Sequence, residues 1–105
     1  MKIAAIALVA AGVLASGAVL AQSAEDLIKK NGCAACHSND KKIVGPAYVD
    51  VAAKYKGDAG AAAKLAEKIK KGGQGVWGPV PMPPNPNVSD ADLKTIVTYI
   101  LALKK

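Results

Sequence analysis

The sequence predicts an all-α protein. Four segments carry apolar residues at the 3.6-residue spacing of amphipathic helices, and no segment shows the period-two alternation of a half-buried strand. A stretch rich in Gly and Pro, residues 72–87, can form neither a helix nor a central strand. The four helical segments are residues 24–31, 47–55, 59–71 and 89–104.

The first helical segment, residues 24–31, has acidic residues early and lysines late, which is the order that the helix dipole favours. We expect Gly32 to end it. The second segment, residues 47–55, is shorter. The predicted apolar face of the first segment consists of Ala24, Leu27 and Ile28.

The third segment, residues 59–71, contains the i,i+4 pair Glu67 and Lys71, and Gly72 and Gly73 are expected to end it. The fourth has a capping residue at Ser89. The predicted face of the third comprises Ala62, Leu65, Ala66 and Ile69, and that of the fourth Leu93, Ile96, Val97, Ile100 and Leu101, widened by Tyr99 and Leu103.

The loop of residues 72–87 has the composition of a linker. However, it holds Trp77, the only tryptophan, and Met82, the only methionine besides Met1. We therefore predict an ordered, extended loop that positions these side chains.

Residues 1–21 have the pattern of a secretory signal peptide, in which Lys2 precedes a long apolar run that ends in small or apolar residues. Cleavage is expected after Ala21, with Ala24 as a second possibility, and an uncleaved membrane anchor is the alternative. Residues 22–105 then form one exported domain, located in the periplasm and not inserted in a membrane.

Such a small domain buries little surface and usually needs additional stabilisation. The chain has no Phe, and its two cysteines are too close in sequence for a disulfide to constrain much chain. We infer that a group other than side chains completes the core.

All basic residues are lysines, and the net charge is +6. An exported chain without Arg or interleaved aromatic residues is not expected to bind nucleic acid. The positive charge then indicates either an acidic protein partner or a solvated surface with no specific partner.

The central motif is Cys33-Ala34-Ala35-Cys36-His37, a CxxCH sequence of the kind that attaches c-type haem. Two thiols can add to the two vinyl groups of the porphyrin, and the adjacent imidazole can then bind the iron. A thiol–disulfide oxidoreductase also uses CxxC, but in a βαβ context that is not seen here. A zinc site needs four ligands, and too few Cys and His residues are present.

Met82 is predicted as the sixth iron ligand by elimination. His37 is the only histidine, and Met1 leaves with the signal peptide. Met82 lies between prolines, in a stiff segment that has little conformational freedom to lose. A lysine ligand, an open position, or a packing role for Met82 are the alternatives. His/Met ligation predicts an electron carrier and no enzyme, whereas an open position would suit a haem enzyme or a gas sensor.

Two stretches, NGCAACHSNDKKIVGPAYVDVAAKY and GGQGVWGPVPMPPNPNVSDAD, resemble the bacterial class I cytochromes c of the c-551/c-552 (cytochrome c8) type. The resemblance covers about residues 25–103. It implies about four helices around one covalently attached haem c, with the first and last helices packed together.

The resemblance also implies roles for three further residues. The Pro46 carbonyl would accept the Nδ1–H of His37, the Trp77 indole would bind a haem propionate, and Asn85 would lie near the Met82 sulfur. Some relatives carry Arg near the propionates where this chain has Lys68, so that contact is left open.

The implied partners are redox proteins, namely a membrane quinol-oxidising complex as donor and a nitrite reductase, cytochrome oxidase or peroxidase as acceptor. A monomer is expected. The lysines expected to attract acidic partners are Lys29, Lys30, Lys41, Lys42 and Lys54.

Overall fold

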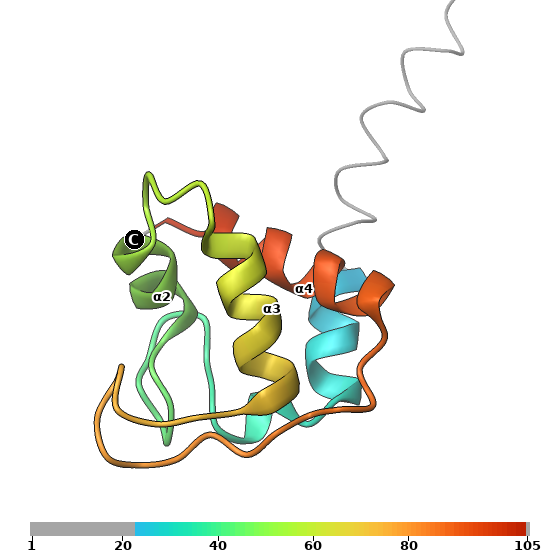
Figure 1. Cartoon of the computed structure of the whole chain (residues 1–105), viewed down its shortest axis with the longest axis horizontal. Helices are drawn as coiled ribbons and strands as arrows, with labels where there is room; N and C mark the ends of the chain where they lie inside the picture. The colour runs from blue at the N-terminus through green and yellow to red at the C-terminus, as the bar shows by residue number, and fades with distance from the viewer. Residues whose placement is uncertain (1–22, 105) are drawn as a thin grey trace, which may run out of the picture.

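The structure is a computed structural model, and it describes residues 23–104 (Figure 1). Four α-helices and one short 3₁₀ helix occur in that range, and no strand does, so the all-α prediction is confirmed. No helix in this range is long and apolar enough to cross a membrane. The predicted signal peptide, residues 1–21, lies outside the described residues. The helices are an N-terminal helix (residues 23–30), η1 (Cys33–Ala35), α2 (Tyr48–Lys54), α3 (Ala61–Lys71) and α4 (Asp90–Ala102).

The predicted stop and start residues act as expected at three helix ends. Gly32 adopts the left-handed conformation, with φ 75°, in the turn that follows the N-terminal helix. Gly72, with φ 70°, is the C-terminal cap of α3. At the start of α4, the Ser89 hydroxyl accepts the backbone N–H of Asp92 at 3.2 Å. These local signals are readable in the sequence because each depends on a few neighbouring residues.

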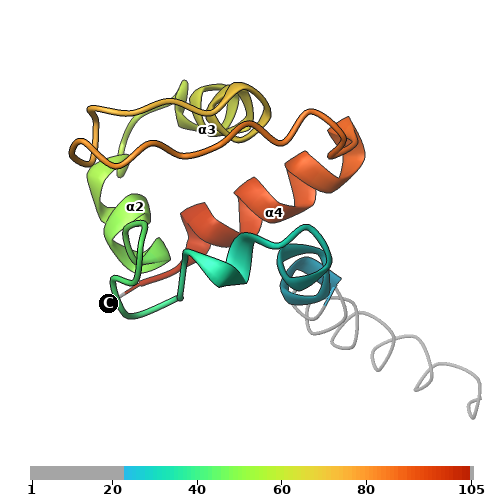
Figure 2. The same cartoon turned by 90° about the horizontal axis from the view of Figure 1, so that it is seen from below.

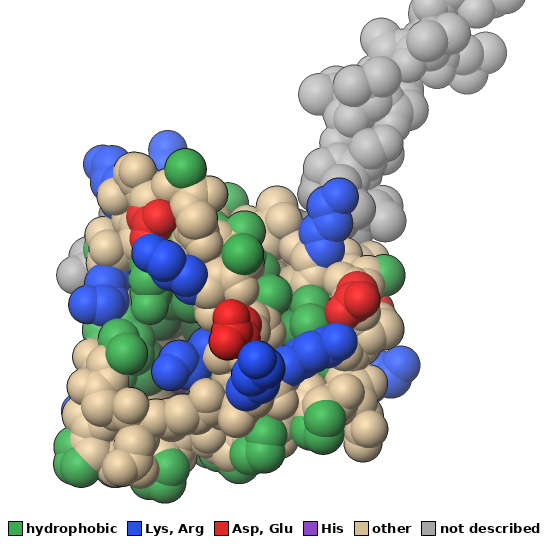
Figure 3. All heavy atoms as spheres, viewed as in Figure 1, with side chains coloured by type: hydrophobic (Ala, Val, Ile, Leu, Met, Phe, Trp, Pro, Cys, Tyr) green, Lys and Arg blue, Asp and Glu red, His purple; other side chains and the backbone are tan. Residues whose placement is uncertain are grey.

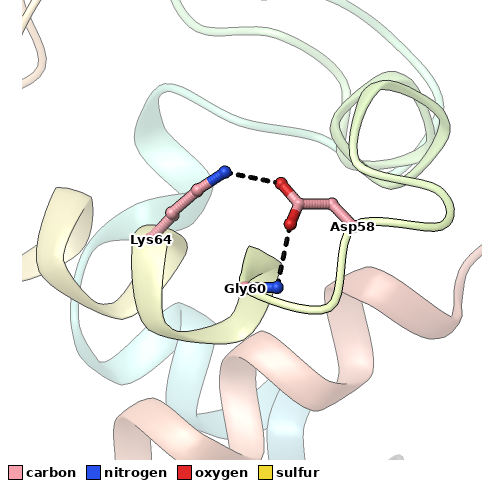
Figure 4. Close-up of polar contacts among 3 residues, drawn as sticks. All are labelled: Asp58, Gly60 and Lys64. Carbon is pink, nitrogen blue, oxygen red and sulfur yellow. Dashed lines mark hydrogen bonds and ion pairs between the residues drawn. The ribbon is translucent and has the colours of Figure 1, made fainter.

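The buried face of α3 differs from the predicted one. The helix begins at Ala61, and Ala61, Leu65 and Ile69 are buried, whereas Ala62 is exposed. Residues 59–60 belong to a turn, in which the Asp58 carboxylate accepts the Gly60 N–H at 2.8 Å and so fixes where the helix starts (Figure 4). The apolar stripe therefore follows i, i+4 and i+8 from Ala61.

Helix α4 is the centre of the core. It contacts both α2 and α3, and Figure 2 shows it crossing the middle of the molecule, with α3 above it and α2 beside it. Its Ile96 and Val97 are only 1% and 2% exposed. Ile28 of the N-terminal helix belongs to the same buried cluster, which places the first and last helices against one core, as the resemblance implied.

The Tyr99 hydroxyl joins three parts of the chain that are distant in sequence. It donates to the Glu25 carboxylate of the N-terminal helix at 2.8 Å and accepts the Asn39 side-chain amide at 2.9 Å. Partial burial, and then the bond to Glu25, raise the pKa of the phenol. Tyr99 was predicted only as a member of the apolar face, so its hydroxyl contacts are an addition from the structure.

We expect Tyr99→Phe to destabilise the holoprotein by about 1 kcal/mol, because it removes two hydrogen bonds at a partly exposed position and keeps the ring. For a domain of this size this lowers the melting temperature by about 5 °C. Thermal unfolding followed by circular dichroism measures it. Thr98→Ala, an exposed change on the same helix, is the control and should stay near the parent. Equal melting of Tyr99→Phe and the parent would show that the hydroxyl contributes nothing.

The Asp58 carboxylate is expected to make the stability of the fold depend on pH. Its carboxylate also accepts Lys64 Nζ at 2.7 Å, and this bond, followed by the Gly60 N–H, lowers the pKa of Asp58 from its ordinary value of 3.8 (Figure 4). A carboxyl with a lowered pKa stabilises the fold fully above its ordinary value and loses that contribution as the pH falls through the lowered one.

The Asp58→Asn variant removes the charge but keeps an oxygen for the Gly60 N–H. We expect it to melt slightly below the parent at pH 7, with the difference shrinking towards zero below about pH 4. The bond from Lys70 also lowers the pKa of Asp90, but this pair is common to both proteins, so its effect cancels in the comparison. A difference independent of pH would mean that the ionised carboxylate is not the cause.

Candidate functional site: an apolar cavity lined by a thiol, an imidazole and a thioether

A cavity opens between α2, α3 and α4, and holds about 760 Å³ of space, part of it open to solvent. Figure 3 shows hydrophobic side chains in a hollow between α2 and α3, with lysines at its rim. The lining is almost entirely apolar and includes no carboxylate. It consists of Cys33, His37, Pro46, Tyr48, Val51, Leu65, Lys68, Ile69, Gly73, Gln74, Gly75, Val76, Trp77, Gly78, Val80, Met82, Ile96 and Ile100.

The two cysteines lie at and just after η1, and both are free thiols. Cys33 lines the cavity and packs against the core, and its burial raises the pKa of its thiol. Cys36 is half-buried and lies outside the lining. The turn is held by the His37 N–H, which donates to the Cys33 carbonyl at 3.0 Å. Nowhere in residues 23–104 do three His, Cys, Asp or Glu side chains gather as a metal-ion site requires.

The imidazole of His37 is held on three sides. Its Nδ1 lies 2.8 Å from the Pro46 carbonyl oxygen, and its ring stacks on Tyr48 with centroids 5.0 Å apart. Because a carbonyl can only accept, Nδ1 carries the proton and Nε2 keeps its lone pair for a metal. On another side, a Cβ added to Gly45 would overlap the ring, so only glycine leaves room there. Sequence analysis did not identify the roles of Tyr48 and Gly45.

Met82 is fixed through its backbone. Its N–H donates to the Gly73 carbonyl at 2.8 Å, and the Gly73 N–H donates back to the Met82 carbonyl at 3.0 Å. A Cβ on Gly72 would overlap the Met82 carbonyl oxygen, so the close approach of the two segments requires glycine there. Figure 2 shows the loop of residues 72–88 on one side of the molecule and the segment around η1 on the other. Met82 and His37 therefore reach the same cavity from different segments.

The remaining predicted residues divide into two groups. Trp77 and Lys68 line the cavity, and the Lys54 ammonium lies 5.5 Å from the centre of the Trp77 ring. Asn85 does not line it. Its side-chain amide donates to the carbonyls of Ile69, at 3.3 Å, and Pro83, at 3.2 Å, so it ties the Met82 loop to the end of α3.

The cavity fits a haem by its donor set and by its unfilled apolar surface. It offers a thiol, an imidazole with a free Nε2 and a thioether, which are the groups that attach and ligate haem c. Val76, Trp77 and Val80 line it and yet are 48%, 42% and 60% exposed. An exposed apolar surface of this kind indicates a binding site for a large apolar group. A bound haem would supply an iron that changes oxidation state by one electron.

An all-α fold around one such cavity, with CxxCH at its wall, defines a c-type haem protein. The cytochrome c family matches residues 21–104. The chain is 56% identical to cytochrome c-551 of Pseudomonas aeruginosa over 96 residues, covering 87% of this chain and 91% of the relative. It is 55% identical to cytochrome c-552 of Nitrosomonas europaea over 97 residues, covering 89% and 94%. The crystal structure of the wild-type Nitrosomonas protein matches with TM-score 0.74 and 59% identity over 76% of this chain and 99% of that one.

The chain therefore belongs to the cytochrome c family, and within it to the c-551/c-552 type. Cytochromes of this type are small electron carriers with one covalently attached haem c, which confirms the predicted cofactor and fold.

Proposed function

We propose that this chain is a periplasmic one-electron carrier whose haem is attached through Cys33 and Cys36 and ligated by His37 and Met82. The observation that carries the proposal is the pairing of His37 and Met82 in one apolar cavity, each held by backbone hydrogen bonds from its own segment. Both side chains would bind the iron of a haem held there, which would leave no free coordination site for a substrate or a gas.

The chain's own residues have distinct tasks in this proposal. The two thiols would hold the haem covalently, each by adding its sulfur to one carbon of a vinyl group and its proton to the other, so the attachment would consume no oxidant. His37 presents Nε2 because Nδ1–H is bound to Pro46, and this bond also makes the imidazole a stronger donor. The Met82 thioether would favour ferrous iron and the apolar lining would keep water away, and both would raise the reduction potential.

Asn85 has a supporting task, and the structure suggests how. By binding the Ile69 and Pro83 carbonyls, it holds the segment next to Met82 against α3. It would thus stabilise the thioether–iron bond through the loop backbone. Trp77, at the cavity rim, would present its indole N–H to a haem carboxylate.

The test is an optical spectrum and intact mass of the chain exported in a strain with haem-attachment machinery. We expect a mass of residues 22–105 plus one haem, a Met-to-ferric-iron charge-transfer band, and no reaction of the reduced protein with CO. Rapid CO binding would favour a haem enzyme or gas sensor with an open position. A colourless protein with the bare-chain mass would instead support a thiol redox protein.

Acidic redox partners are the second part of the proposal, with a membrane quinol-oxidising complex as donor and a nitrite reductase, oxidase or peroxidase as acceptor. The five predicted steering lysines, Lys29, Lys30, Lys41, Lys42 and Lys54, are all exposed. We expect the rate of electron transfer to such an acceptor to fall as ionic strength rises, because salt screens the attraction. A rate independent of salt would reject electrostatic steering.

A further inference from the structure

The turn after the N-terminal helix contains Asn31-Gly32, the only Asn-Gly pair in the sequence. In such a pair the backbone nitrogen of the glycine can attack the side-chain amide of the asparagine and close a five-membered ring. Glycine favours this reaction because it has no side chain to obstruct the ring and because its backbone is unusually free. Gly32 directly precedes Cys33, so any change in this pair affects the turn that carries the CxxCH motif.

Both reacting groups of the pair are hydrogen-bonded to carbonyls of the preceding helix turn. The Asn31 side-chain Nδ2 donates to the Leu27 carbonyl at 2.8 Å, and the Gly32 N–H donates to the Lys29 carbonyl at 3.1 Å. The backbone N–H of Asn31 also donates to the Leu27 carbonyl, at 3.0 Å. Ring closure would bring the Gly32 nitrogen onto the side-chain carbon of Asn31, so it requires the first two of these bonds to break.

The pair is also held from the side of the CxxCH motif. The Gly32 carbonyl accepts the Ala35 N–H at 3.2 Å, at the start of η1. Cys33 after the pair and Ile28 before it both pack in the hydrophobic core. The link between the helix and η1 is therefore fixed at both ends, and it becomes free only when this region opens or unfolds.

We propose that Asn31 is a deamidation site that is closed in the folded protein and open in the unfolded chain. In the open chain the Gly32 nitrogen bonds to the side-chain carbonyl carbon of Asn31 and the bond from that carbon to Nδ2 breaks. The proton of the attacking nitrogen leaves with Nδ2 as ammonia. Water then opens the cyclic imide at one of its two carbonyls and leaves either aspartate or isoaspartate. Water is the only co-reactant, and no oxidant or reductant takes part.

The products of this reaction no longer fit the end of the helix. An aspartate at position 31 has no side-chain N–H for the Leu27 carbonyl. Its negative charge lies at the C-terminal end of the helix, where the helix dipole disfavours it. Isoaspartate in addition inserts an extra methylene carbon into the backbone just before Cys33. A chain that is modified while unfolded is therefore expected to refold to a less stable protein.

The experiment follows position 31 by peptide mass mapping while the purified protein stands in mildly alkaline buffer, with and without denaturant. In denaturant we expect conversion of Asn31 to aspartate and isoaspartate. In the folded protein we expect a rate lower by roughly tenfold or more, because the reaction waits for local opening. The other asparagines, none of which precedes glycine, are internal controls: Asn39, Asn85 and Asn87. Asn31→Gln keeps an amide but would have to close a larger ring, so it should resist conversion in denaturant.

A second variant, Asn31→Asp, reproduces one product and tests its effect on the fold. We expect it to lower the melting temperature by about 5 °C, because it replaces a hydrogen-bond donor by a charge that faces a carbonyl. Asn87→Asp makes the same chemical change at an exposed position in the loop before α4 and should melt near the parent.

Three outcomes would overturn the proposal. Equal conversion in the folded and the denatured protein would show that the bonds to Leu27 and Lys29 protect nothing. Conversion in denaturant no faster than at the other asparagines would show that Asn31 is not a preferred site. Melting of Asn31→Asp at the parent temperature would show that the modification does not harm the helix end. The mass readout at position 31 does not depend on iron coordination, so its result is independent of the test of the proposed function.

Discussion

Met82→Ala is expected to lower the reduction potential by on the order of 0.2 V, a fraction of the roughly 0.8 V range that axial ligands control. The backbone of the loop should survive, since residue 82 is held by two hydrogen bonds to Gly73 that any side chain permits. The change therefore removes the thioether and little else of the site. The reduced variant should bind CO, and the Met-to-ferric-iron band should disappear.

Val80→Ala is the matched control for this experiment. Val80 lies in the same loop and lines the same cavity, but it offers no ligand atom. It should keep the parent potential and exclude CO. If Met82→Ala retains a closed, six-coordinate iron at the parent potential, Met82 is not the ligand. Lys68, the lysine in the lining, then becomes the candidate, and a Met82→Ala/Lys68→Met double variant would test it.

The place of Met82 at the cavity could be anticipated, because the sequence offers few candidate iron ligands. The sequence displays directly one histidine, one methionine besides Met1 and a CxxCH motif, which are features of composition and spacing. The helix ends at Gly32, Gly72 and Ser89 were predictable for a similar reason, since capping depends on adjacent residues.

Contacts between distant segments were not predictable in this way. The Tyr99 hydroxyl meets Glu25 and Asn39 across 74 and 60 positions, and Lys54 reaches Trp77 from another element. Each of these contacts depends on how the helices pack against one another. The periodicity of the sequence predicts which face of a helix is apolar, but not which residues of another segment that helix meets. Even within a correctly predicted face one member can differ: Leu65 and Ile69 are buried as predicted, but the third buried residue of α3 is Ala61, whereas Ala62 is exposed.

Gly45 is the clearest case of a residue whose importance only the packing reveals, and Gly45→Ala is expected to destabilise the holoprotein by about 1–3 kcal/mol. A methyl group there would overlap His37 Cε1 and lie 2.8 Å and 2.9 Å from the two ring nitrogens. The backbone of Gly45 has little room to retreat, because its N–H donates to the Cys36 carbonyl at 2.7 Å and its carbonyl accepts the Ile43 N–H at 3.2 Å. The imidazole must therefore move.

Movement of the ring distinguishes this effect from ordinary overpacking. A displaced His37 lengthens its 2.8 Å bond to Pro46, weakens the imidazole as a donor and lowers the affinity for iron on that side. Chemical denaturation should thus show reduced stability together with an altered haem spectrum in Gly45→Ala. Gly60→Ala adds the same methyl group in ordinary contact, 3.4 Å from Asp58 Oδ1, and should leave the spectrum unchanged. If Gly45→Ala has the spectrum and the stability of the parent, the structure around His37 accommodates the extra methyl group without moving the ring. The contacts with Pro46 and Tyr48 would then be sufficient to orient the imidazole.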